Sequence, residues 1–346
     1  MKLGLILGTH GAKFTINMDL IREAEDLGFD SVWTSEAWGS DAISPAAWIL
    51  AQTSRIKVGT GIIQMPARTP AMAAMTAMTL QQLSDNRFIL GIGPSGPQVI
   101  EGWHGQPYGR PLTRTREYIE IIRKIMAREG PLTHQGHHYQ IPNTGDGTTG
   151  LGKPLKTILH TDQPLKIVTG TISPAGVRTS AEVADGMIPV FMNPERFDVF
   201  EAPLNEGFAK AGGGKGLADF EITPFCGVNI NDDLEAARQP IRENLALYIG
   251  GMGARDKNFY NDYAKRLGHE GAAVEIQDNF LAGRRHEALA AVPDQLIDEV
   301  SLVGPAGRIA ERLQDWQAAA KDNKVAAILA SCRTREEIQL LAKTVL

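Results

Sequence analysis

The chain has 346 residues, of which 43% are hydrophobic and 22% are charged, and these proportions exclude a mainly disordered protein. Its net charge of −5 argues against a nucleic-acid binder, which needs a concentrated basic face. The two cysteines, Cys226 and Cys332, have no metal-binding spacing, and neither a leader peptide nor a membrane-spanning apolar stretch is visible. We therefore expect a cytoplasmic protein without metal, nucleic-acid or membrane partners.

The first third of the chain repeats one unit, a short apolar strand followed by a helix. Strands are expected at residues 2–7, 29–34, 56–60 and 88–92, and helices at 17–27, 44–51 and 70–83. Asn17 is a good N-cap and Gly28 a good C-terminal stop for the first helix. Met72, Met75 and Met78 fall on one face of the third helix, which indicates core packing. Strands that alternate with helices in this way predict a parallel sheet.

The rest of the chain continues the alternation less regularly. Strands are expected at 165–169, 186–190, 220–230 with an interruption at Pro224, and 325–330. Helices are expected at 113–127, 174–184, 305–320 and 334–345. Eight strands predict a single α/β domain over residues 1–346, a (β/α)8 TIM barrel with insertions around 133–164 and 232–291. A doubly wound open sheet is the main alternative.

In a barrel, the loops after the carboxyl ends of the strands carry the chemistry. Here these loops are rich in Gly, Ser, Thr and Gln, which suits close approach of the backbone to a planar ligand that bears a phosphate. Ser173 and Pro174 are typical of a capped helix start after the fifth strand. The free N–H groups of such a start can hold a phosphate, although a plain capped helix is an equal alternative.

One loop contains a formal G-x-G-x-x-G motif at residues 91–96, which is found in dinucleotide sites. That fingerprint must run directly into a helix, but Pro94 and Pro97 interrupt it. A glycine-rich loop on the catalytic face is the better interpretation.

Histidine and carboxylate side chains at the predicted barrel mouth are candidates for acid–base chemistry. His10 follows the first strand and Glu36 follows the second, and a loop or surface role is the alternative for each. His134, His137 and His138 raise the possibility of a metal site, but no carboxylate or cysteine cluster completes a ligand set. We therefore predict no metal.

Residues 59–62 (Gly-Thr-Gly-Ile) and 88–105 resemble the bacterial luciferase-like flavin superfamily. The resemblance extends over residues 1–200 and more weakly to the end of the chain. It is strongest to the branch that uses coenzyme F420, an 8-hydroxy-5-deazaflavin, and that includes methylenetetrahydromethanopterin reductases and secondary alcohol dehydrogenases. The resemblance implies a TIM barrel with insertions, in agreement with the strand count.

The resemblance also implies roles for residues at the strand ends. A cis non-proline peptide bond, here Gly61–Ile62, would support the deazaflavin ring. An acidic residue after the second strand, polar residues after the fourth and a phosphate loop after the fifth would complete the cofactor site. These residues are Glu36, Ser95, Gln98, Gly170, Thr171, Ile172 and Ser173.

Two departures from the family pattern leave the proton-transfer group open. Ala37 stands where many relatives have a histidine, and Gln98 stands where some relatives have a glutamate donor. The candidates for catalytic residues are His10, Glu36 and Glu101. The candidates for the walls of an apolar substrate pocket are Trp38, Met65 and Trp103.

The leading hypothesis is an oxidoreductase that transfers a hydride between coenzyme F420 and a small organic substrate. The alternative with the same fold is an FMN-dependent monooxygenase, and a third hypothesis is a non-catalytic flavin-binding protein. Relatives often form dimers, so we expect a homodimer.

Overall fold

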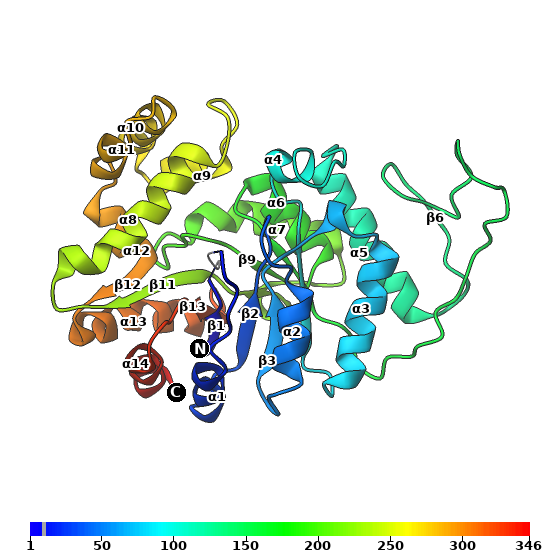
Figure 1. The fold of residues 1–346 in the computed structure, drawn as a ribbon, viewed down its shortest axis with the longest axis horizontal. Coiled ribbons are helices and arrows are strands. Elements are labelled where there is room, and N and C mark those ends of the chain that lie inside the picture. The colour runs from blue at the N-terminus through cyan, green and yellow to red at the C-terminus, as the bar shows by residue number, and fades with distance from the viewer. Residues whose placement is uncertain (9–11) are drawn as a thin grey trace.

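The computed structural model describes residues 1–8 and 12–346, and its centre is a ring of parallel strands (Figure 1). Each strand pairs in parallel with the next along the path β9-β8-β5-β3-β2-β1-β13-β11. These strands are β1 (Lys2–Ile6), β2 (Ser31–Thr34), β3 (Lys57–Thr60), β5 (Phe88–Gly93), β8 (Ile167–Gly170), β9 (Gly186–Ile188), β11 (Phe225–Ile230) and β13 (Ala327–Ala330).

The seventh barrel strand closes the ring and is divided in two at Pro224, as predicted. Its first part, β10 (Glu221–Ile222), pairs with β9, and its second part, β11, pairs with β13. On one side the N–H of Phe225 donates to the carbonyl of Pro189 (3.0 Å), and on the other the N–H of Leu329 donates to the carbonyl of Pro224 (2.9 Å). Because one segment is bonded on both sides, the sheet is a closed barrel and not a doubly wound open sheet.

Helices cover the outside of the barrel, and their starts follow local capping rules. The side chains of Asn17, Thr69, Ser173 and Thr334 each accept a hydrogen bond from an N–H of the first helical turn. The helices are α1 (Met18–Asp26), α2 (Ile43–Leu50), α3 (Pro70–Leu83), α5 (Pro111–Ala127), α6 (Pro174–Val183), α7 (Asp198–Ala211), α13 (Ala306–Lys321) and α14 (Arg335–Val345).

The barrel interior is packed with side chains from six strands. This inner cluster consists of Ile6, Trp33, Ile89, Val168, Ile188 and Leu329, all at most 8% exposed. Ile62 and Phe225 are partly buried and pack against it. The inner cluster therefore ends at Ile62, which lies in the turn between β3 and β4 (Ile63–Gln64).

The two insertions have very different structures. Residues 133–164 contain only the two-stranded hairpin β6 (His134–Gln135) and β7 (Gln140–Ile141), and they extend away from the barrel beside α3 and α5 (Figure 1). The second insertion consists of helices packed on one another, and a short strand beside β11 follows it. These elements are α8 (Leu234–Gly251), α9 (Phe259–Arg266), α10 (Glu270–Leu281), α11 (Arg285–Ala290), α12 (Asp294–Val300) and β12 (Ser301–Gly304).

The sequence predicts neither α12 nor β12, because segments of seven and four residues carry too little periodicity to be read. Short elements complete the described chain: the 3₁₀ turns η1 (Met65–Ala67) and η2 (Leu217–Asp219), and α4 (Pro97–Ile100). None of the helices in the described residues is both long and apolar enough to cross a lipid bilayer.

Candidate active site at the carboxyl end of the barrel

The turn after β3 brings three strand ends together. The Gly61–Ile62 peptide bond is cis, as predicted. The Ile62 side chain lies directly over two glycines: a Cβ atom at Gly93 would be 2.8 Å from Ile62 Cδ1, and one at Gly170 would be 3.1 Å from Ile62 Cγ2. Glycine at these two strand ends therefore makes room for Ile62, which forms an apolar surface between β3, β5 and β8.

Glu36, after β2, fixes the segment that follows Ile62. Its side chain is only 6% exposed. One oxygen accepts a hydrogen bond from the Gln64 N–H (2.8 Å) and is paired with the Arg68 guanidinium, and the other accepts from the Ala42 N–H (3.0 Å). With both oxygens occupied, Glu36 has the contacts of a positioning residue.

Gln64 extends this network to the loop after β5. Its Nε2 donates to the Ser95 hydroxyl (3.2 Å) and to the Ala37 carbonyl (3.1 Å), and its Oε1 lies 2.6 Å from His104 Nε2. The hydroxyl of Tyr108 donates to the Ser95 carbonyl (3.0 Å). Ser95 has a positive φ of 58°, so two side chains hold the loop at a residue that rarely adopts this conformation.

Gly91, the first glycine of the G-x-G-x-x-G motif, has a role within the sheet. A Cβ atom there would lie 1.7 Å from the Thr60 carbonyl oxygen, so any side chain would force β3 and β5 apart. The Thr60 hydroxyl also bonds the Gly91 N–H (2.9 Å) and carbonyl (2.8 Å). Only the short α4 follows the motif, so the dinucleotide interpretation is excluded.

The loop between β8 and α6 is built as the sequence predicts. Ser173 caps α6 by accepting from the Gly176 N–H (3.2 Å), and Pro174 occupies the first helical position. A Cβ atom at Gly176 would lie 2.0 Å from Thr171 Oγ1, so glycine lets the Thr171 side chain fold over the helix start. The loop therefore begins at Gly170, beside Ile62, and ends at Ser173, at a helix N-terminus that favours anions.

The other predicted site residues are distributed less compactly. Gln98, Glu101, Trp38 and Trp103 are exposed, and the Glu101 carboxylate accepts a hydrogen bond from the Tyr108 N–H (3.3 Å). His10 lies outside the described residues.

Met65 is fully buried in the core, contrary to the predicted place in a substrate pocket. It begins the η1 turn and Pro66 follows it, and its side chain packs with the core residues that surround the barrel.

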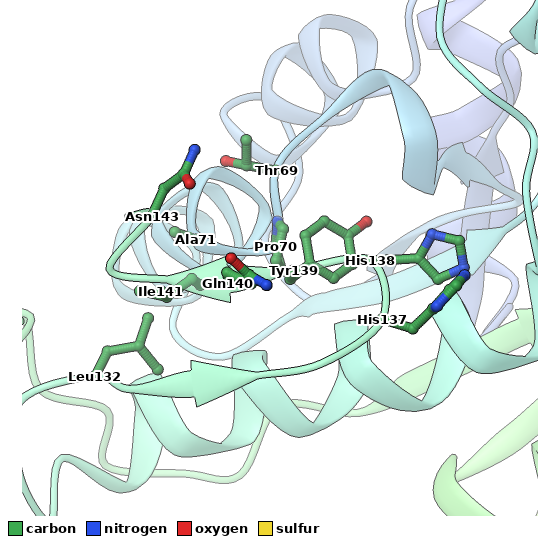
Figure 2. A pocket seen from close by; sticks show the side chains of 10 residues that line it. All are labelled: Thr69, Pro70, Ala71, Leu132, His137, His138, Tyr139, Gln140, Ile141 and Asn143. Atoms are coloured by element: carbon green, nitrogen blue, oxygen red, sulfur yellow. The ribbon is translucent and has the colours of Figure 1, made fainter. Parts of the chain in front are cut away.

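Two of the three histidines of the first insertion, His137 and His138, line a surface hollow. Residues 69–71 of the α3 start face the β6–β7 hairpin across a hollow of about 610 Å³, the Thr69–Asn143 groove (Figure 2). His134 is buried between Glu117 and Glu120, at distances of 3.7 and 3.6 Å. The described residues contain no group of three His, Cys, Asp or Glu side chains that could hold a metal ion.

Sequence reasoning missed two residues that the structure brings to the site, namely Gln64 and His104. Each is adjacent to a position that the sequence did single out, Met65 and Trp103. Their long polar side chains gave no pattern, because their partners are remote in sequence.

Comparison with known proteins agrees with this geometry. The family model described as luciferase-like monooxygenase matches residues 1–323. A Mycobacterium tuberculosis protein, provisionally named a coenzyme F420-dependent oxidoreductase, is 45% identical over 350 residues, which cover 100% of this chain and 99% of the relative. A 5,10-methylenetetrahydromethanopterin reductase of Archaeoglobus fulgidus is 25% identical over 94% of this chain and 93% of its own.

A solved structure has the same fold. The coenzyme F420-dependent tetrahydromethanopterin reductase of Methanopyrus kandleri superposes with a TM-score of 0.78, at 22% identity, over 99% of this chain and 98% of its own. The family model covers most of the chain and a relative well above 30% identity spans it fully, so the chain is an oxidoreductase that belongs to the luciferase-like monooxygenase family.

Proposed function

We propose that the protein transfers a hydride between coenzyme F420 and a small organic substrate at the carboxyl end of the barrel. The observation that carries the proposal is the Ile62 surface, which is flanked on one side by the Glu36–Gln64–Ser95 network and on the other by the phosphate-type loop 170–173. The name of the 45% identical relative supports coenzyme F420 as the cofactor.

The residues at the site match the parts of such a cofactor. A flat apolar ring suits the exposed part of Ile62 between Gly93 and Gly170. The loop at Gly170, Thr171, Ile172 and Ser173 would hold the phosphate, and Ser95 and Gln98 would border the ring on the β5 side. When bound, the deazaflavin supplies the hydride chemistry, and the protein supplies orientation and electrostatics.

Glu36 and Arg68 hold Gln64 in place, and Gln64 in turn fixes His104 and Ser95. We assign the accompanying proton to a side chain at this edge, with His104, His10 and Glu101 as the candidates. His104 is the best placed of them in the described structure, because its imidazole is anchored at one nitrogen and partly exposed. Trp38 and Trp103 are exposed on the same loops and are proposed to contact the substrate.

Titration of the full chain with coenzyme F420 and with FMN, each followed by fluorescence, tests the cofactor. Tight binding of coenzyme F420, and oxidation of its reduced form by carbonyl or alkene substrates, are the expected results. Preference for FMN with oxygen consumption would replace the proposal by a monooxygenase. Binding without turnover of either cofactor would favour a non-catalytic flavin-binding protein.

We also propose a homodimer that buries α2 and α3. Trp48 on α2 and Met72 and Met75 on α3 are 53–58% exposed, and only Met78 of the three methionines lies in the core, which corrects the expectation from sequence. Large apolar side chains exposed on outer helices could be covered in such an interface. Analytical ultracentrifugation that returns a monomer at micromolar concentration would contradict a dimer.

A further inference from the structure

Arg266 connects the second insertion to the phosphate-type loop. It is the last residue of α9, and its Nη2 donates to the carbonyl oxygen of Ile172 at 2.8 Å. Its guanidinium carbon lies 5.3 Å from the centre of the Tyr263 ring, which is fully buried. The side chain is thereby held between the ring and the loop that begins α6.

The charge of Arg266 has no counterion in the described part of the chain. Its Nη1 is buried and has no hydrogen-bond partner, and no carboxylate forms an ion pair with it. Burial lowers the pKa of Arg266, and interactions with Tyr263 and Asp262 oppose this shift. Removing a guanidinium from water without a compensating anion is costly, so such a group is typical of a site that receives an anion.

Arg196, a second arginine at the end of α9, has the acidic partner that Arg266 lacks. It also reaches this end of α9, where its Nη1 donates to the carbonyl of Leu267 (2.8 Å). Its Nε, however, is paired with the Asp198 carboxylate at 3.0 Å. The two arginines are neighbours, since Arg196 Nη2 also donates to the Arg266 carbonyl (3.3 Å). Arg196 has an acidic partner and a partly exposed side chain, whereas Arg266 has no acidic partner and a buried, unpaired Nη1.

We propose that Arg266 binds the phosphate group of the cofactor and thereby completes an anion site with the start of α6. The inference rests on the proposed function for the presence of a phosphate-bearing cofactor at this loop. Both parts attract an anion: the guanidinium provides a full positive charge and two N–H directions, and the helix start provides free N–H groups and the positive end of the dipole. The second insertion would then contribute directly to cofactor binding.

The test compares pairs of ligands with and without the phosphate. FMN and riboflavin differ in the phosphate alone, whereas coenzyme F420 also carries an anionic oligoglutamyl tail, so the FMN pair is decisive. Dissociation constants of the full chain are measured by fluorescence for FMN against riboflavin, and for coenzyme F420 against its phosphate-free 8-hydroxy-5-deazaflavin ribityl core. Arg266→Met should weaken binding of the phosphorylated member of a pair by roughly 10- to 100-fold and leave the other member unchanged. Arg266→Lys, which keeps the charge, should lose less.

Arg196→Met is the matched control and should leave the phosphate preference intact. The inference is overturned if Arg266→Met weakens both members of each pair equally, or neither, or if the wild-type chain shows no preference for a phosphate. Thermal unfolding verifies the fold of each variant. If Arg266→Met does not fold, Arg266→Lys is measured in its place, and the inference is again overturned if both members of each pair, or neither, are weakened. A chain that binds FMN with an Arg266-dependent preference but rejects coenzyme F420 would refute the proposed cofactor and still support this inference.

Discussion

The barrel and the first insertion use the same device to attach a turn to a helix. In the barrel, the Glu25 carboxylate on α1 accepts hydrogen bonds from the N–H groups of three consecutive residues, 54–56, just before β3. In the insertion, the Glu117 carboxylate on α5 accepts from the N–H groups of residues 137–139 in the β6–β7 turn, at 2.7–3.1 Å. Both carboxylates are nearly buried.

The two turns differ in how the strands next to them are paired. The residue 54–56 turn leads into β3, which is bonded on both sides within the closed ring. The residue 137–139 turn joins β6 and β7, which pair only with each other among the described strands, and beyond them Leu151 is 84% and Ile158 91% exposed. The same local contact should therefore stabilise the whole fold in one case and one segment in the other.

The largest effect is expected for Glu25→Gln. All three N–H groups donate to Glu25 Oε1, and an amide oxygen at this place is a neutral acceptor. The charge-assisted part of three hydrogen bonds is then lost, so global stability should fall by about 2–3 kcal/mol. Urea unfolding measures this change. Asp26→Asn, at an exposed neighbouring carboxylate, is the control and should change stability by less than about 0.5 kcal/mol. Equal effects of the two variants would refute the special role of Glu25.

Acid should remove the difference between wild type and Glu25→Gln. Burial raises the pKa of Glu25, but its backbone hydrogen bonds outweigh burial and hold the pKa below its ordinary value. A carboxyl with a lowered folded-state pKa stabilises the protein above the unfolded pKa of about 4.3, and this contribution is lost as the pH falls through the folded value. The stability gap, measured from pH 7 to pH 3, should therefore shrink below about pH 4. A gap that widens in acid would contradict this assignment.

Glu117→Gln should have a smaller and local effect. The hairpin should detach from α5, so limited proteolysis within residues 133–164 should accelerate by about tenfold while the unfolding midpoint changes little. Glu129→Gln, at an exposed carboxylate just after the end of α5, is the control. A large fall in global stability for Glu117→Gln would show that the hairpin is part of the barrel's cooperative unit.

The smallest effect concerns reactivity toward thiol reagents. Burial raises the pKa of the Cys226 thiol to about 12, and Cys332 is also buried, so both should resist alkylation in the native barrel. An added Leu151→Cys in the insertion should react at least roughly 100-fold faster, because its position is exposed. Rapid alkylation of the native cysteines at pH 8, followed by mass spectrometry, would show that the barrel opens readily.

The barrel could be predicted from sequence because its signals are local. Buried strands, capped helix starts and the division of the seventh strand at Pro224 each depend on a few adjacent residues. The resemblance added the cis bond at Gly61–Ile62, which no local pattern specifies. The contacts of Glu36 could not be predicted, because Arg68 lies 32 residues away and approaches only in the folded barrel.

The second insertion shows the same limit more clearly. Its residues indicated helices but no binding site. The proposed role of Arg266 depends on its hydrogen bond to Ile172, which lies 94 residues earlier in the sequence. Likewise, the burial of Met65 depends on the turn that follows β4 and not on its own apolar character.

A crystal structure of the full chain with bound coenzyme F420 tests the central claim most directly. The account predicts the deazaflavin ring against Ile62 and within contact of Gln64 and Ser95, with the phosphate at residues 170–173. A ring bound in the Thr69–Asn143 groove, or one that leaves Ile62 uncovered, would contradict it.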